Sequence, residues 1–125
     1  MGKTSQRKGR DGERELRDCL KEYGYDVECG EPQSFGKVPD LVGLPGIHIE
    51  CKRVERLNVP GAMQQAVRDA ERFQDGMPVL FHRRNRQPWL VTVQLNDFMR
   101  IYQAAAESSA VTSYSAGEYE STSEA

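Results

Sequence analysis

Cysteine and histidine are scarce in this 125-residue chain, and their spacing suits neither a disulfide framework nor a zinc site. The three cysteines, Cys19, Cys29 and Cys51, are odd in number and widely separated, so they indicate reduced core residues of a cytosolic protein. His48 and His82 stand far from any ligand-spaced partner. We interpret the first as a surface or site-lining residue and the second as a strand residue.

Long apolar runs are also missing. No stretch approaches the ~20 apolar residues that are needed to cross a bilayer, and residues 1–7 lack the apolar core of a signal peptide. The apolar content of 38% is ordinary for a soluble globular chain, and a chain of this length builds one domain. The sequence therefore predicts a single soluble, cytoplasmic domain.

The chain has no overall excess of positive charge, because its formal net charge is -2. Residues 104–125, however, contain four glutamates and no basic residue, and residues 1–103 alone carry a net charge of +2. The basic residues of that part gather in three clusters, at 3–14, 52–56 and 83–86. Such clusters are typical of surfaces that contact phosphate, so the acidic total does not exclude a nucleic-acid partner.

The hydrophobic pattern predicts three helices and five strands. Helical spacing of apolar residues indicates helices over residues 10–23, from Pro60 to about Gly76, and from an Asn96 cap onward. Apolar or alternating segments predict strands at 25–29, 38–42, 47–52, 77–82 and 88–93, the last two as an antiparallel pair. We expect an α/β domain over residues 10–106, a flexible basic arm at 1–9 and a disordered acidic tail at 107–125.

Two carboxylates and an ammonium group fall on neighbouring predicted strands. Side chains alternate along the strand at 47–52, so Glu50 and Lys52 face away from its apolar half. Leu44-Pro45-Gly46 supplies turn residues ahead of this strand, and a hairpin there would bring Asp40 close to Glu50. Because Mg²⁺ prefers carboxylate oxygens, these three residues are a candidate site for metal-activated hydrolysis.

Pro39-Asp40, followed after nine intervening residues by Glu50-Cys51-Lys52, resembles the motif of the PD-(D/E)xK nuclease superfamily. The opening at residues 7–16, Arg-Lys-Gly-Arg-Asp-Gly-Glu-Arg-Glu-Leu, is similar to the start of archaeal-type Holliday junction resolvases and their phage relatives. The resemblance covers about residues 7–103. It implies a restriction-endonuclease-like α/β core, with a central mixed sheet of about five strands flanked by helices. It also implies a homodimeric enzyme of a bacterial, archaeal or phage-infected cell that nicks four-way DNA junctions.

The resemblance assigns roles to individual residues. The catalytic residues it implies are Glu13, Asp40, Glu50 and Lys52. Mg²⁺, or Mn²⁺ in its place, would be held by the carboxylates of Glu13, Asp40 and Glu50 and the carbonyl of Cys51. The residues expected to hold the DNA backbone are Lys8, Arg10, Arg14, Arg53 and Arg56. Apolar candidates for the dimer interface are Trp89, Phe98, Met99 and Tyr102.

Alternatives remain open for two residues and for the function. Glu13 either faces the protein, where it needs a partner such as a metal or Lys52, or is a solvated acid near a helix N-terminus. Gln64 either supports the site as a polar residue near the metal ligands or lies on a solvated helix face. The other functions compatible with the sequence are a nuclease for flaps, duplexes or DNA ends, a DNA-binding module without catalysis, and a fold that binds no nucleic acid.

Overall fold

The structure is a computed structural model that describes residues 2–30 and 37–108, with side chains described from residue 9 onward. These residues form three helices and five strands in an α/β arrangement, which confirms the predicted fold class. The elements are, in chain order, α1 (Gly2–Glu22), β1 (Glu28–Cys29), β2 (Leu41–Val42), β3 (Ile47–Arg53), α2 (Val59–Phe73), β4 (Met77–Arg83), β5 (Leu90–Thr92) and α3 (Leu95–Glu107).

The five strands divide into a mixed three-stranded sheet and a separate antiparallel pair. In the larger sheet, β4 lies between β3 and β5, parallel to the first and antiparallel to the second. The parallel pair is joined by α2, because parallel neighbours need a crossover connection. The remaining strands, β1 and β2, pair with each other.

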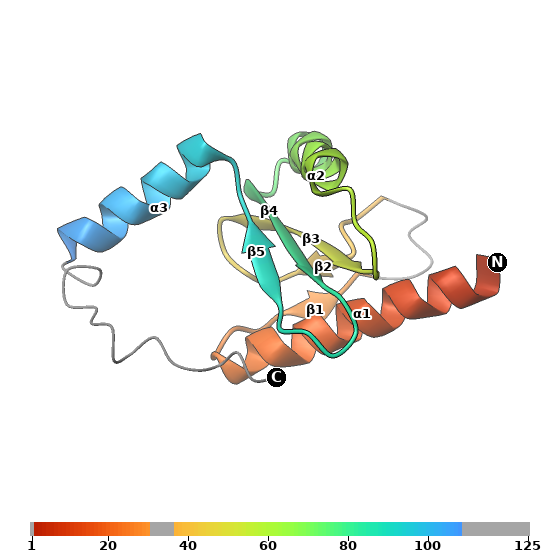
Figure 1. Ribbon diagram of the computed structural model, residues 1–125. Coiled ribbons are helices and arrows are strands. Elements are labelled where there is room, and N and C mark those ends of the chain that lie inside the picture. The colour runs from red at the N-terminus through yellow and green to blue at the C-terminus, as the bar shows by residue number, and fades with distance from the viewer. Residues whose placement is uncertain (1, 31–36, 109–125) are drawn as a thin grey trace.

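Helices cover both faces of the three-stranded sheet, with α1 on one side and α2 on the other (Figure 1). Leu16 of α1 belongs to a core cluster with Ile49 of β3 and Phe81 of β4. On the opposite face, Ala66 of α2 packs with Leu80 of β4. Alternate residues of each strand therefore face different helices, as strand geometry requires, and the even-numbered residues of β3 face α2.

The first helix is longer than predicted. It begins at Gly2, whereas the sequence predicted that the helix begins at Arg10, after a flexible basic arm. Residues 3–10 contain no proline and several residues of high helix propensity, and a single Gly9 is not sufficient to end a helix. The basic cluster at the start of the chain therefore has a helical backbone.

The predicted hairpin between the second and third strands does not form. β2 pairs with β1, while Leu44 and Ile47 are joined only by a turn, in which the Ile47 amide donates to the Leu44 carbonyl at 3.1 Å. Gly43, at φ 116°, brings the chain against β1, since a Cβ atom there would lie 2.3 Å from the Asp26 carbonyl oxygen. This close backbone approach directs β2 toward β1 and away from β3.

The last helix extends away from the sheet (Figure 1). It starts at Leu95, with Gln94 rather than the predicted Asn96 in the N-cap position and no capping hydrogen bond from the Gln94 side chain. The predicted tail from residue 109 onward lies outside the described residues. None of the helices in the described ranges combines the length and the apolar character that a bilayer crossing requires.

Candidate active site

A cavity of about 140 Å³ lies beside β3, between the segment that leads into β2 and the last turns of α2. Three carboxylate residues line it, Asp40, Glu50 and Asp69, together with His48 and Arg72. Asp40 and Glu50 thus reach the same cavity, as the spacing of the motif predicts. They do so without the hairpin, because Asp40 immediately precedes a strand that pairs elsewhere.

The Glu50 carboxylate is buried and held from both sides. Its Oε1 atom lies 3.3 Å from Nε2 of His48, and its Oε2 atom lies 3.8 Å from Nζ of Lys52. The three residues share one face of β3, because their positions differ by two. The side chain of Lys52 keeps 29% exposure, so part of it is open to solvent.

His48 connects Glu50 to a second carboxylate. Its Nδ1 atom lies 3.0 Å from both carboxylate oxygens of Asp75, and its ring stacks on Phe73 with 6.2 Å between the ring centroids. Burial lowers the pKa of His48, but the hydrogen bonds with Glu50 and Asp75 and the charges of both acids outweigh this effect and raise the pKa above its ordinary value. The two carboxylates therefore favour the protonated form of the ring over what a free histidine would show.

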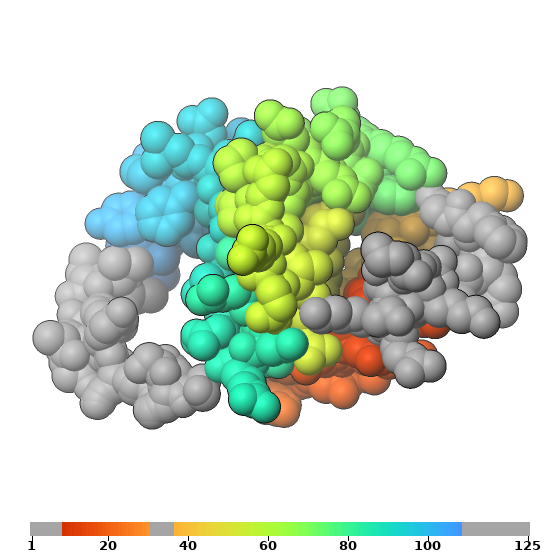
Figure 2. Space-filling model, turned by 45° about the vertical axis from the view of Figure 1, so that its right-hand side comes forward, coloured from red at the N-terminus to blue at the C-terminus, as the bar shows by residue number. Residues whose placement is uncertain are grey.

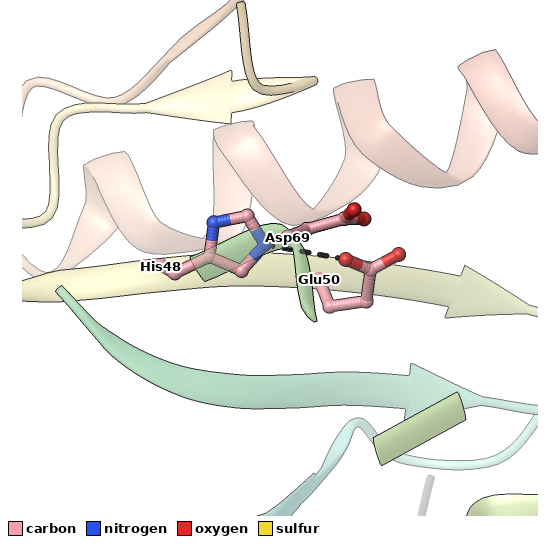
Figure 3. Close-up of side chains that lie close together, drawn as sticks. All are labelled: His48, Glu50 and Asp69. Carbon is pink, nitrogen blue, oxygen red and sulfur yellow. Dashed lines mark hydrogen bonds and ion pairs between the residues drawn. The ribbon is translucent and has the colours of Figure 1, made fainter. Parts of the chain in front are cut away.

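His48, Glu50 and Asp69 offer ligand atoms that all lie within 4.8 Å of one another, and Figure 3 shows the Asp69 and Glu50 carboxylates side by side with the His48 ring next to them. In its protonated form the His48 ring has no lone pair for a metal. Because both nitrogens of His48 face carboxylates, we assign this residue to orienting Glu50. The atoms suited to bind a cation at this cavity are then the carboxylate oxygens, which hard divalent ions prefer.

Glu13 joins this acidic group from α1. Burial raises its pKa to about 7, together with the charge of Asp40, a hydrogen bond with Asp40 and the charge of Glu50, while Arg10 acts in the opposite direction. Burial and the neighbouring carboxylates therefore both disfavour the charged form of Glu13 when no cation is bound. The interpretation of Glu13 as a solvated acid is therefore disfavoured, and the crowding fits a divalent ion.

Gly12 explains how α1 approaches β3 so closely. It is buried, and a Cβ atom at this position would lie 2.8 Å from Cβ of Arg53. Only a residue without a side chain fits there, and the next residue, Glu13, is carried toward Asp40 and Glu50 as a result. Cys51, between Glu50 and Lys52, is half-buried, and the charges of the same acids act on it. Burial and the charges of Glu13, Glu50 and Asp40 raise the pKa of the thiol, so the thiol stays neutral.

The predicted DNA contacts occupy different environments. Arg10, Arg14 and Arg56 are exposed, and Arg14 lies 4.0 Å from Asp11. Arg53 is half-buried and donates from Nη2 to Asn85 Oδ1 at 3.2 Å, so its guanidinium group connects β3 to the turn after β4. The side chain of Lys8 lies outside the described part of the structure.

Gln64 is exposed on α2 and is absent from the described lining of the acidic cavity. The residues that α2 contributes instead are Asp69, Arg72 and Phe73, and the acid among them, Asp69, was not predicted from the sequence. A signal for it existed, because Ala62, Ala66 and Phe73 stand at helical spacing with Asp69 on the same stripe. Asp75, which follows α2, carried no such signal, since only the fold brings it to His48.

Comparison with known families agrees with this geometry. A family model described as "Phage putative PDDEXK endonuclease" matches residues 4–124. The chain belongs to this family. The endonuclease is therefore a metal-dependent nuclease of the PD-(D/E)xK type with DNA as its substrate, which confirms the resemblance at the level of the superfamily and its phage relatives. None of the curated proteins compared with the chain matches it.

Proposed function

We propose that the endonuclease is a Mg²⁺-dependent, structure-selective enzyme that resolves four-way DNA junctions by paired nicks. The observation that carries this proposal is the gathering of Glu13, Asp40 and Glu50 from three separate segments, with Lys52 beside Glu50. Acids crowd in this way at a considerable electrostatic cost. A divalent cation relieves that cost, which is why such clusters are typical of metal sites.

The residues that would hold the cation are Asp40, Glu50, Glu13 and the carbonyl of Cys51, and Asp69 supplies a further oxygen donor at the same cavity. When bound, Mg²⁺ lowers the pKa of coordinated water and neutralises charge on the phosphate. Lys52 offsets the negative charge that builds up on the phosphate and orients the attacking water. We favour Mg²⁺, with Mn²⁺ as an alternative, because His48 is committed to Glu50 and Asp75.

Contacts with the DNA backbone would come from the basic residues of α1 and of the segment after β3. The exposed basic residues are Arg10 and Arg14 on α1 and Arg56 after β3. We add Lys8 on α1 and Arg53 at the end of β3 to this set. Phosphate contacts of this kind position the duplex without reading its sequence, and they make binding steeply dependent on salt. This is the behaviour expected of an enzyme that recognises DNA shape.

Two strands of a four-way junction must be cut, whereas the chain carries one acidic cavity of this kind within its described residues. We therefore propose a homodimer, acting in the cytoplasm of a phage-infected cell. Phe98, Met99 and Tyr102 of α3 are 47%, 38% and 42% exposed and suit a dimer contact. Trp89 is partly buried against the core and is a weaker candidate.

The decisive experiment compares wild type with Asp40→Asn on end-labelled four-way junction, flap and linear duplex, in Mg²⁺ and in EDTA. We expect symmetric nicks in the junction with Mg²⁺ and none in EDTA. Asp40→Asn should bind the junction and cut it at least ~10²-fold more slowly, because a metal ligand is lost. Asp18→Asn is the matched control, since Asp18 is an exposed acid of α1. Faster cutting of flap or duplex would favour the nuclease alternatives, and binding without any cleavage would favour a non-catalytic module.

A further inference from the structure

A second and larger cavity, of about 360 Å³, lies on the α2 face of the sheet, where β3 and β4 end. The connection from β3 to α2 forms one wall and the turn between β4 and β5 forms the other. In Figure 2 these two segments, yellow-green and teal, adjoin each other on one face of the molecule. The Asn85 amide donates to Glu55 Oε2 at 2.8 Å and holds the two walls together.

This cavity is lined by a residue of β4, the strand next to the one that carries Lys52. His82, which lines it, is the register partner of Lys52 in the parallel pair of β3 and β4, so both side chains stand on the same face of the sheet. Neighbouring strands are ~4.8 Å apart, and successive bases along one DNA strand are separated by ~3.4 Å. A nucleotide next to the phosphate at Lys52 is therefore within reach of the cavity.

The lining combines an apolar interior with a cationic rim. Leu57, Val59, Pro88 and Leu90 supply the apolar part, and Arg84 and His82 supply polar groups. His82 is fixed by a 2.9 Å contact from Nε2 to Thr92 Oγ1, and burial lowers its pKa, so it presents a neutral ring. A planar base binds between apolar walls with few polar groups, and its phosphate binds a cation. The cavity offers both, because it has apolar walls and an arginine at its rim.

The other charged residues of the lining are already engaged. Arg83 lies 3.1 Å from the Glu15 carboxylate through Nε, and its guanidinium carbon lies 5.8 Å from the centre of the Trp89 ring. Glu55 accepts the hydrogen bond from Asn85. Arg84, exposed at the rim, is thus the cation best placed to meet a phosphate.

We propose that this cavity takes up one unpaired nucleotide adjacent to the cleaved phosphate, and that the endonuclease prefers branched DNA carrying such a nucleotide. The inference rests on the proposed nuclease site, because the position of Lys52 defines which nucleotide is adjacent. A base inside a duplex must first be unstacked and unpaired, whereas a base that is already unpaired enters a pocket at least cost. The cavity therefore makes the enzyme distinguish an opened branch point from a closed duplex.

The test uses the full chain with Asp40→Asn, so that DNA is bound without being cut, and a flap duplex with one unpaired 2-aminopurine at the branch. We expect its fluorescence to rise several-fold on binding, because the base leaves its stacked neighbours. Leu90→Trp, added to this variant, should fill the cavity and abolish the rise. The matched control is Leu95→Trp, which places the same side chain on α3, where Leu95 is 74% exposed.

Cleavage provides the second readout. This assay uses the active enzyme, in which Asp40 is unchanged, and measures the cleavage rate of the flap with the unpaired nucleotide divided by the rate without it. Leu90→Trp should lower this ratio about tenfold, which is the range expected for losing contacts to one base. Arg84→Ala should lower the same ratio, and its exposed position makes loss of folding improbable. An unchanged ratio and an unchanged fluorescence rise in both variants would overturn the proposal. Absence of all cleavage by wild type, with the fluorescence pattern preserved, would instead overturn the proposed catalytic function and would still support uptake of an unpaired nucleotide by the cavity.

Discussion

Nε2 of His48 lies 3.3 Å from Oε1 of Glu50, and this contact joins the acidic cavity to a carboxylate on a different segment. The other ring nitrogen faces Asp75 at 3.0 Å, so Asp75, His48 and Glu50 form a continuous chain of hydrogen bonds. Residues that orient a metal ligand typically change metal affinity by 10–100-fold when they are replaced. We therefore expect His48 to act as a positioning residue that influences a bound cation through Glu50.

Replacing His48 with Phe should raise the Mg²⁺ concentration that gives half-maximal cleavage by about 10–100-fold. Phe keeps a ring against Phe73 but cannot donate to Glu50, whose carboxylate then loses its orientation. A Mg²⁺ titration of junction cleavage measures the effect. His48→Gln retains a donor and should recover part of the affinity, while Asp75→Asn should cause a smaller change. An unchanged Mg²⁺ midpoint in His48→Phe would contradict the positioning role.

In EDTA the acidic cluster should destabilise the protein as the pH rises. The pKa of Glu13 is about 7 in the folded state and 4.5 as its ordinary value, so the folded state binds more protons between these two values. The free energy of unfolding should then fall as the pH increases from 4.5 to 7 and stay low above 7. Partial solvation of Glu13 limits this contribution to on the order of 1–2 kcal/mol.

Glu13→Gln removes the charge and should stabilise the protein in EDTA at pH 8, as measured by urea denaturation. The same substitution should lower the stabilisation that Mg²⁺ provides, because a metal ligand is lost. Glu22→Gln is a control on the same helix, where the side chain is exposed. Equal effects of the two substitutions would show that the crowding at Glu13 has no energetic consequence.

Gly12→Ala should impair both folding and catalysis. The added methyl group would lie 2.8 Å from Cβ of Arg53, and overpacking of this kind costs about 1–3 kcal/mol. Displacing α1 also moves Glu13, and a shift of ~1 Å at a catalytic group can lower the rate by ~10²-fold. Gly9→Ala is the matched control, because no atom lies within 4 Å of the added Cβ. That variant should be stabilised slightly by its higher helix propensity.

Phe98→Asp should weaken the proposed dimer without unfolding the chain. Phe98 is 47% exposed and its ring centroid lies 6.3 Å from that of Tyr102, so a charge there would be buried only in an interface. Loss of such an anchor typically costs about 2 kcal/mol or more, or roughly a 30-fold weaker association. Sedimentation velocity measures the shift, with Gln103→Asp as the control on the same helix. Identical sedimentation of Phe98→Asp and wild type would argue against α3 as the contact.

Several parts of the fold and of the site were predictable because they depend on neighbours in the chain. Strand alternation placed Glu50 and Lys52 on one face of β3, and this face also carries His48. The helix after Asn58 follows from local chemistry, since the Asn58 side chain accepts a hydrogen bond from the Gly61 amide at 3.2 Å and a proline occupies the first turn. The order of helices and strands was correct for the same reason.

Contacts between distant segments were beyond the reach of such patterns. The pairing of β2 with β1 depends on the approach of Gly43 to Asp26, which no short motif encodes. Asp75 reaches His48 because β4 runs parallel to β3, with Met77 opposite Ile47. Asp75 was missed for this reason, and the start of α1 was misplaced because residues 3–10 carry no clear boundary signal.

Periodicity and side-chain chemistry, which act over a few residues, were enough to mark Asp40, Glu50 and Lys52 as a group suited to a divalent ion. Packing of α1 against β3 and the parallel pairing of β3 with β4 determined which other residues join these three at the site. They placed Glu13 among the other acids, raised its pKa to about 7, and brought His48 between Glu50 and Asp75. Burial and charge repulsion depend on which segments meet in space, and only the folded chain brings these segments together.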